Sequence, residues 1–234
     1  PFEPVPVKEH VPYQQAIRLA IEIASIPGFD LQTSTKRVYE STSQTMSHVL
    51  GYTGLISATD IDSYSDYQPI DEIGKLGVER SFESLLRGVP GKLVYEVDAR
   101  GNQQAIVSKT ESVPGANVSL GIDLDFQKYI EQSLQDTLDS VGATKGSVVA
   151  LDPQTGAVRA LVSLPAYDAN LFIGGIDEET YSDLIENIDQ PLFPRAIAGE
   201  YPSGSIFKPF IAYAALTEGI VNKHTSFLST GQSK

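Results

Sequence analysis

The sequence lacks cysteine altogether and contains only three histidines in 234 residues. A chain without cysteine cannot form disulfides or thiolate zinc sites. His10, His48 and His224 lie far apart in the sequence and do not show the spacing of metal ligands. We therefore predict neither a metal site nor a bound cofactor, and we expect these histidines to be structural or exposed.

Positive charge is also scarce. Lysine and arginine number 17 against 30 aspartate and glutamate residues, which gives a net charge of −13 at pH 7. Such an acidic chain is a poor match for nucleic acid or for an anionic membrane surface. The acidic residues are scattered, which is typical of a solvated protein surface.

Long apolar runs are missing as well. A membrane-spanning helix needs roughly 20 consecutive apolar residues, and no stretch of this sequence approaches that length. The chain begins at Pro1, without a methionine or a signal-peptide pattern. We expect it to be a piece of a longer protein.

Hydrophobic periodicity predicts a mixture of helices and strands in two parts. Residues 112–116 (SVPGA) indicate a linker, which divides the chain into residues 1–116 and 117–234. We expect helices at residues 13–26, 77–86 and 178–185, strands at 29–39 and around 48–56, a loop or lid at 59–71, and hairpins pairing 92–98 with 103–109 and 146–152 with 157–163.

A longer helix is predicted directly after the linker. Asp123 and Asp125 lie where a helix N-terminus favours negative charge. An apolar stripe then recurs every four residues, at Phe126, Ile130, Leu134 and Leu138.

The stretch that carries chemistry is residues 201–216 (YPSGSIFKPFIAYAAL), which is apolar on all sides after Lys208. Such a helix is predicted to be buried. Ser205 and Lys208 lie three residues apart, which places both on one helical face with Cβ atoms about 5–6 Å apart. A serine hydroxyl needs an adjacent base, and an amine removed from water can accept a proton. Helix N-terminal N–H groups would favour the oxyanion.

Other charged or polar side chains have simpler interpretations. A Ser-x-x-Lys tetrapeptide occurs often by chance, and Lys208 could extend from a surface helix into water. Asp152 is interpreted as a turn former, and Arg195 as a structural ion-pair donor. Tyr201 could line a cleft or pack in the core. We assign catalysis to none of these three.

The order of several motifs resembles class B penicillin-binding proteins of the elongation type, penicillin-binding protein 2. The matching stretches are HVLGYTGLI at 48–56, GKLGVERSFESLLRG at 74–88, YEVDARG at 95–101, IDLDFQ at 122–127, VALDPQTGAV at 149–158, PAYDANLF at 165–172, PRAIAGEYP at 194–202 and the Ser205–Lys208 tetrapeptide. Ser-x-x-Lys is also a mark of that class.

The resemblance implies an α+β fold. Residues 1–116 would form a β-rich pedestal of the dimerisation type. Residues 117–234 would form the N-terminal part of an α/β transpeptidase domain, with a sheet and a buried active-site helix. Ser205 would be the acylated serine and Lys208 its base in a peptidoglycan D,D-transpeptidase.

The resemblance also implies partners and a location. The substrate would be the D-Ala-D-Ala end of a peptidoglycan stem peptide, which β-lactams imitate. A membrane glycan polymerase and other elongation-complex proteins would be partners. The protein would face outward from the cell membrane, into the periplasm, anchored by an N-terminal helix that this chain lacks.

Two departures and two alternatives accompany this interpretation. Ile206 and Ser203 replace the threonine and proline usual in the family. The Ser-x-Asn and Lys-Thr-Gly elements have no matching positions, so we expect this chain alone to be inactive. The alternatives are a non-enzymatic pedestal that regulates a glycan polymerase, and a serine β-lactamase or penicillin sensor, against which the long N-terminal part argues.

Overall fold

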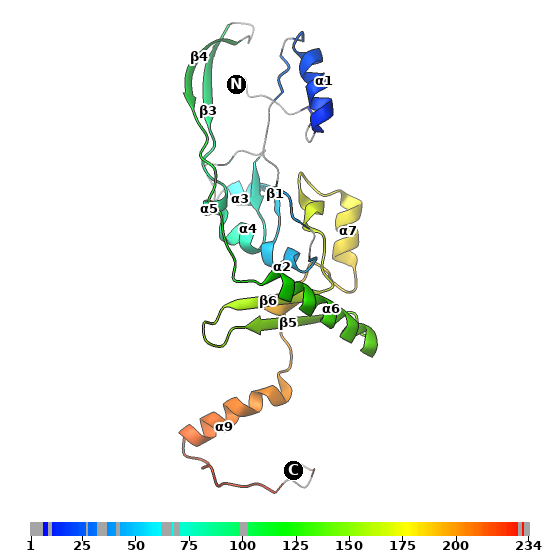
Figure 1. Cartoon of the computed structure of the whole chain (residues 1–234), viewed down its shortest axis with the longest axis vertical. Coiled ribbons are helices and arrows are strands. Elements are labelled where there is room, and N and C mark those ends of the chain that lie inside the picture. Colours follow the sequence, from blue (N-terminus) through cyan, green and yellow to red (C-terminus); the bar gives the residue numbers. More distant parts are fainter. Residues whose placement is uncertain are drawn as a thin grey trace. The chain divides into compact units, whose positions relative to one another are not determined.

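The structure is a computed structural model in which two compact units are distinguished, residues 1–196 and residues 197–234. Short antiparallel strand pairs and helices alternate along the first unit (Figure 1). This mixture agrees with the predicted α+β class. The structure describes residues 7–8, 11–26, 28–31, 37–40, 43–61, 67, 71–98, 103–228 and 231.

A two-stranded sheet lies at the centre of residues 43–88. Strand β1 (Thr53–Leu55) pairs antiparallel with β2 (Glu72–Gly74), and helices α2 (Met46–Leu50), α4 (Gly77–Ser81) and α5 (Glu83–Leu86) flank it. The predicted helix at 77–86 is thus confirmed, with a break at Phe82. The strand prediction at 48–56 is wrong in its first half. There α2 ends at Gly51, which has a φ of +76° and no room for a β-carbon, because one would lie 1.9 Å from the Leu76 carbonyl oxygen.

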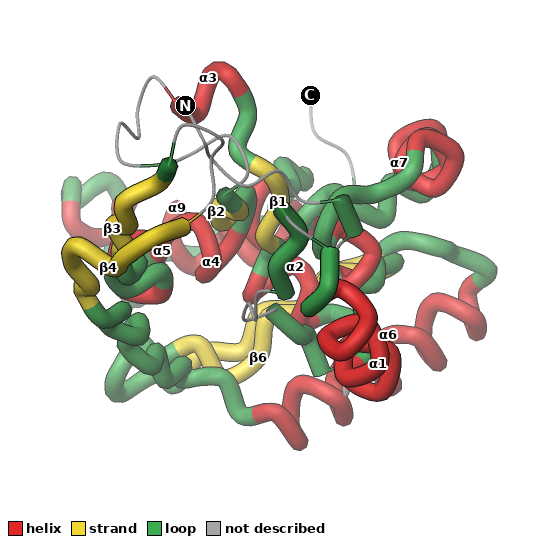
Figure 2. Tube along the Cα trace, turned by 90° about the horizontal axis from the view of Figure 1, so that it is seen from above, coloured by secondary structure: helices red, strands yellow, loops and turns green. Residues whose placement is uncertain are grey.

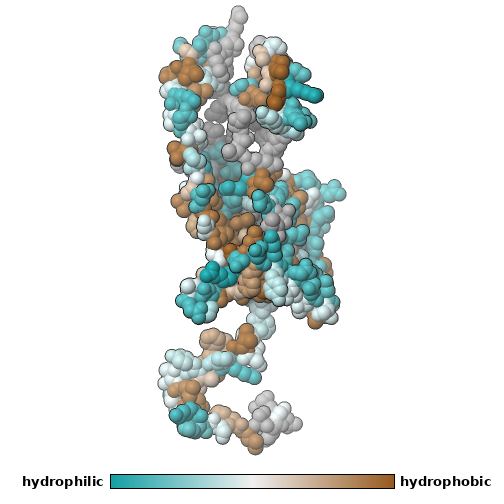
Figure 3. All heavy atoms as spheres, in the orientation of Figure 1, coloured by the Kyte–Doolittle hydropathy of each residue, from teal (hydrophilic) through white to brown (hydrophobic). Residues whose placement is uncertain are grey.

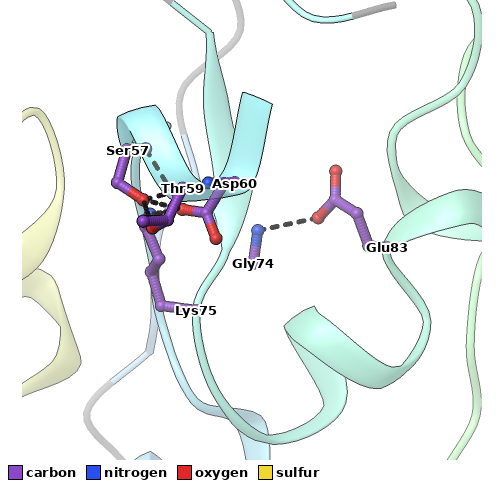
Figure 4. A network of polar contacts seen from close by, with 6 residues as sticks. All are labelled: Ser57, Thr59, Asp60, Gly74, Lys75 and Glu83. Carbon is purple, nitrogen blue, oxygen red and sulfur yellow. Dashed lines mark hydrogen bonds and ion pairs between the residues drawn. The ribbon is translucent and has the colours of Figure 1, made fainter. Parts of the chain in front are cut away.

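The range 59–71, predicted as a loop or lid, begins with helix α3 (Ala58–Ile61). Ser57 and Asp60 bond each other's backbone N–H groups in a capping box. Lys75 Nζ lies 2.5 Å from Asp60 Oδ2 (Figure 4). Hydrogen bonds from Lys75 and Ser57 hold the pKa of Asp60 well below its usual range. Residues 62–66 and 68–70 lie outside the described residues.

Two buried glutamates bind neighbouring segments, Glu79 of α4 to Arg37 and Glu83 of α5 to strand β2. Glu79 pairs through both oxygens with the Arg37 guanidinium, at 2.8 and 2.9 Å. Burial raises the pKa of Glu79, and the Arg37 charge opposes that rise. Glu83 accepts the backbone N–H of Gly74 at 2.7 Å (Figure 4) and the Tyr67 hydroxyl at 2.6 Å. Buried carboxylates are tolerated only with such partners.

The hairpin predicted at 92–109 is confirmed. Strands β3 (Lys92–Val97) and β4 (Gln103–Thr110) pair antiparallel, and residues 99–102, which connect them, lie outside the described residues.

The stretch predicted as a linker is not free chain. Val89 and Val113 exchange two backbone hydrogen bonds of 2.8 and 2.9 Å, and the Ala116 N–H reaches the Leu85 carbonyl at 2.8 Å. A β-carbon at Gly115 would lie 2.0 Å from the Leu86 carbonyl oxygen. Gly115 therefore serves a close backbone approach to α5, which its sequence context cannot distinguish from a flexible joint.

The N-terminal helix is confirmed as α1 (Tyr13–Ile23). The strand predicted at 29–39 is not found at residues 29–31 and 37–39, which are irregular. The residues between them lie outside the described part of the chain.

Helix α6 (Leu124–Val141) packs on the hairpin of β5 (Gly146–Leu151) and β6 (Val158–Leu164), whose pairing is antiparallel as predicted (Figure 1). Asp123 caps α6 by accepting the Phe126 N–H at 3.1 Å. Its apolar face and the hairpin form a core of Leu138, Val162 and Leu164, with Ile130, Leu134 and Val148 against it.

One member of the predicted stripe is wrong. Phe126 is 38% exposed, and Gln127 is fully buried in its place. At 3.6 residues per turn, a four-residue step overshoots one turn by about 40°. Three such steps carry Phe126 about 120° away from Leu138, whereas the three-residue step from Gln127 to Ile130 restores the face.

Three further short helices follow β6 before residue 199, joined by loops (green in Figure 2). Residues 178–185, predicted as a helix, form most of α7. The helices are η1 (Ala169–Phe172), a 3₁₀ turn, α7 (Glu178–Glu186) and α8 (Arg195–Ala198).

Residues on both sides of the predicted boundary at 116 pack in one core. Tyr39 is buried with Tyr167 and Phe172, and the Tyr52 ring stacks on Phe172 with centroids 3.7 Å apart. The Asn170 amide bonds both backbone groups of Tyr39, at 2.8 and 3.0 Å. Residues before and after position 116 are therefore in direct contact. The domain boundary at residue 116 remains a prediction.

His48 belongs to this junction and predicts a pH-dependent stability. It is 6% exposed, and its Nε2 lies 3.4 Å from the Pro165 carbonyl oxygen. Burial lowers the pKa of His48, the Pro165 carbonyl opposes this, and the Arg195 charge adds to it. The unfolded imidazole takes up a proton below about pH 6.5, which the folded one resists. Stability should therefore be constant above that pH and decrease below it, by at most about 1.4 kcal/mol per pH unit.

Denaturant unfolding of the protein at pH 7.5 and 5.5 measures this decrease. We expect His48→Asn to reduce the difference between the two pH values, and His224→Asn, at an exposed position, to leave it unchanged. An equal pH dependence in wild type and His48→Asn would contradict the assignment.

Candidate active-site segment

The segment that carries Ser205 and Lys208 lies in the second unit. It begins as a 3₁₀ turn, η2 (Gly204–Phe207), and continues as α9 (Lys208–Thr217). Gly204 has a φ of +56°, a conformation that glycine adopts without strain. Ser205 therefore follows a sharp bend and lies in the first turn, where N–H groups lack intrahelical partners.

Pro209 explains the change of helix type. It lies in the first turn of α9, where a missing N–H is tolerated. Its missing N–H would leave the Ser205 carbonyl without an α-helical partner, and that carbonyl instead accepts the Lys208 N–H. In a 3₁₀ turn, side chains three residues apart lie above one another. The local backbone thus keeps Ser205 and Lys208 on one face, as the spacing predicts.

The predicted burial of this helix is wrong for this chain. None of the ten residues of α9 is buried, and Ser205 and Lys208 are exposed. The structure describes both side chains, and no hydrogen bond joins the Ser205 hydroxyl to the Lys208 amine. The amine is not removed from water here, so this chain holds the spacing of a nucleophile–base pair without the dry surroundings that would activate it.

Large apolar side chains are exposed along the same segment (Figure 3; α9 is orange in Figure 1). Phe207 and Phe210 stack with centroids 5.6 Å apart and remain 50% and 67% exposed. Helices that are apolar all round are interior helices. Among the described residues, none buries any residue of α9.

The end of the first unit is anchored immediately before this segment. The Ala196 N–H, in the first turn of α8, donates to the buried Ser163 hydroxyl at 3.0 Å. Arg195 is 3% exposed and donates to the carbonyls of Gln190 at 3.0 Å, Phe193 at 3.4 Å and Asp189. Arg195 is structural, as predicted, but it binds carbonyls rather than a carboxylate.

The remaining candidates have no catalytic setting. Asp152 accepts the N–H groups of Gln154 and Thr155, which confirms the turn, and these bonds lower its pKa. Tyr201 is 62% exposed, so neither the core nor a cleft within its own unit covers it.

Within the described residues, no cluster of histidine, aspartate and glutamate side chains could hold a metal ion. None of the helices in this described part of the chain has the length and apolarity of a membrane span.

The sequence interpretation missed a group of fully buried polar residues, Thr45, Gln127 and Ser163. A signal exists for Gln127, because three- and four-residue steps place it on the face of Ile130, Leu134 and Leu138. No comparable signal exists for the other two, because Gln127, which binds Thr45, and Ala196, which binds Ser163, lie far away in sequence.

Two family models match the chain. The Penicillin-binding Protein dimerisation domain matches residues 1–120, and the Penicillin binding protein transpeptidase domain matches residues 146–234. The chain therefore belongs to the penicillin-binding protein family.

Its relatives are of the predicted branch. The chain is 36% identical over 236 residues to the peptidoglycan D,D-transpeptidase MrdA of Haemophilus influenzae, a match covering 98% of this chain and 35% of the relative. The chain thus spans about a third of that relative's length. These similarities confirm the predicted resemblance to penicillin-binding protein 2.

Two solved structures are similar in fold. In the complex between penicillin-binding protein 2 and MreC from Helicobacter pylori, the match has a TM-score of 0.77 at 26% identity and covers 94% of this chain and 39% of that one. A structure titled as the coordination of polymerization and crosslinking by a peptidoglycan synthase complex matches with a TM-score of 0.72 at 32% identity, covering 93% of this chain and 39% of that one.

Arg195 provides a stability prediction. Arg195→Met should leave the backbone carbonyl oxygens of Asp189, Gln190 and Phe193 without their buried donor, at a cost on the order of 1–3 kcal/mol in the free energy of unfolding. Denaturant unfolding of the protein measures it. The control is Arg159→Met, which removes an exposed ion pair to Asp152 at 3.2 Å and should cost at most about 1 kcal/mol. An equal decrease in the free energy of unfolding in the two variants would show that the buried Arg195 guanidinium stabilises the protein no more than the exposed Arg159 does.

Proposed function

We propose that the protein containing this chain is a peptidoglycan D,D-transpeptidase that forms an acyl-enzyme at Ser205, with Lys208 as the base. The supporting observation is that the transpeptidase match, residues 146–234, includes both residues. They stand there three residues apart, directly after Gly204 with its φ of +56°, in a turn that places both on one face.

The reaction follows from the chemistry of the pair. The Ser205 Oγ attacks the carbonyl of the penultimate D-alanine while Lys208 Nζ accepts its proton. The tetrahedral oxyanion is stabilised by the Ser205 N–H and a second donor outside this chain, a contribution of about 2.7–4 kcal/mol per donor in comparable sites. The C–N bond then breaks, and the terminal D-alanine leaves with the proton on its nitrogen. An amine of a second stem peptide attacks the ester, which forms the cross-link and restores the hydroxyl.

This mechanism needs Lys208 to lose its water. The exposed apolar surface of α9 indicates how: further parts of the transpeptidase domain would cover it. Desolvation then favours the neutral amine. Ile206 beside the nucleophile removes a hydroxyl from the mouth of the site and makes it more apolar than the threonine usual in the family.

The proposal includes partners and a location. The dimerisation-domain match and the similarity to a penicillin-binding protein 2 bound to MreC support a pedestal, placed at residues 1–116, that contacts elongation-complex proteins and a membrane glycan polymerase. The protein would face the periplasm from a membrane anchor outside this chain. A purely regulatory pedestal is the second candidate, and loss of cross-linking without loss of polymerase binding would separate the two functions.

Acylation should be confined to one of two neighbouring serines. In the full-length protein, a fluorescent penicillin should label wild type and the matched control Ser203→Ala equally, whereas Ser205→Ala should give no label. Mass spectrometry of the labelled peptide identifies the residue. Labelling of Ser205→Ala, or rapid turnover of a chromogenic cephalosporin by wild type, would contradict the assignment.

The base is tested separately. Lys208→Met should slow acylation roughly 100- to 10,000-fold, the usual contribution of a positioned general base, while Lys223→Met, an exposed lysine of the same unit, should acylate normally. Stopped-flow or quenched labelling gives the rate constants. A Lys208→Met protein that acylates within threefold of wild type would exclude Lys208 as the base.

A further inference from the structure

A buried polar network joins the pedestal residues to the hairpin of the transpeptidase match. The Gln127 Oε1 accepts the Leu161 N–H at 2.7 Å, and Nε2 donates to the Leu161 carbonyl at 2.8 Å. Nε2 also donates to Thr45 Oγ1 at 2.8 Å. Thr45 and Gln127 are both 0% exposed. The amide of Gln127 therefore occupies the edge of β6 as a neighbouring strand would, and it reaches the pedestal at the same time.

The hydroxyls of Ser43 and Thr45 fix which groups donate and which accept in this network. Glu131 Oε2 accepts from Ser43 at 2.5 Å and from Thr45 at 3.0 Å. A carboxylate only accepts, so the Thr45 hydroxyl hydrogen points to Glu131 and its lone pairs face the Gln127 amide. Both hydrogens of Nε2 are then used, and the amide has one orientation in which every group is paired.

The same strand holds the start of the next segment. Ser163 lies two residues after Leu161 on β6, is 1% exposed, and accepts the Ala196 N–H at 3.0 Å. Side chains two residues apart lie on one face of a strand. Ala196 is the last residue of the first unit and stands nine positions before Ser205. Thr45, Gln127, β6, Ser163 and Ala196 are thus linked by a continuous series of hydrogen bonds, made by three fully buried side chains, Thr45, Gln127 and Ser163.

We propose that Thr45, Gln127 and Ser163 are positioning residues for acylation: they fix the point at which the chain enters the Ser205 segment relative to the pedestal. The proposal rests on the proposed function. None of the three touches the reacting atoms, so their loss should slow the acylation step and leave reversible penicillin binding unchanged.

Variants of Thr45 in the full-length protein test this most sharply. Thr45→Val keeps the shape and removes the hydroxyl, and Thr45→Ser restores it. We expect Thr45→Val to slow acylation of Ser205 roughly 3- to 30-fold, the range for residues that couple distant sites, and Thr45→Ser to acylate within about twofold of wild type.

Gln127→Leu should slow acylation at least as much as Thr45→Val. The double variant should acylate no more slowly than Gln127→Leu alone, because both changes break one series of contacts. Gln132→Leu is the matched control, since Gln132 is exposed on the same helix and its side-chain amide bonds only Asp136 among the described residues. Should Gln127→Leu not fold, the Thr45 variants carry the test.

Hydrogen exchange supplies a readout independent of activity. Thr45→Val and Ser163→Ala should each increase exchange at the Ala196 N–H, and Thr45→Val also at the Leu161 N–H, with Gln132→Leu unchanged at both. Slower acylation without these changes, or these changes with wild-type acylation, would overturn the proposal. The proposal would also be overturned if the slower acylation of Thr45→Val were fully explained by a smaller fraction of folded protein. Absence of label at Ser205 in wild type would instead overturn the proposed function, and the exchange measurements would still test the contacts.

Discussion

The side-chain amide of Gln127 is the contact on which the first unit depends. It bonds the N–H and C=O of Leu161 and the hydroxyl of Thr45, three groups drawn from residues 34 and 82 positions away. A buried amide that loses its partners costs about 1–3 kcal/mol, so an alternative packing of α6 on β6 is strongly disfavoured. An apolar side chain at this position would pack equally well against several registers. The polar contact selects one.

The rest of the first unit follows the same rule. Its apolar clusters are small, one around Tyr167 and one around Leu138, and polar side chains fix what these clusters leave undetermined. Asn170 pairs with both backbone groups of Tyr39 as Gln127 does with Leu161. Among the described residues, every buried side-chain nitrogen or oxygen has a hydrogen-bond partner. Hydrogen bonds fix the orientation of the packed segments, because dispersion and hydrophobic contacts depend little on direction.

This division explains what could be predicted from the sequence. The two hairpins, α1, α6 and α7 are set by local periodicity and capping, and they were predicted. Residues 112–116 were predicted as a linker from their glycine and proline. The same residues also occur where two backbone segments approach closely, and only tertiary contacts distinguish a linker from such an approach. Residues 46–50 form a helix within an apolar stretch too short to show a period. The hydrogen bonds from Gln127 to Thr45 and from Ala196 to Ser163 join residues more than 30 positions apart, and no local sequence pattern indicates them.

The candidate site divides in the same way. The placement of Ser205 and Lys208 on one face was predicted from their spacing, which is local. The bend at Gly204 and the 3₁₀ turn before Pro209 are also local, but they were not predicted. The reactivity of the pair is not local, because a lysine becomes a base only when surrounding atoms exclude water. α9 in this chain has the geometry and lacks that cover. A Ser-x-x-Lys turn alone therefore does not make a serine reactive, and any group that removed Lys208 from water would have to contact the exposed apolar faces of α9.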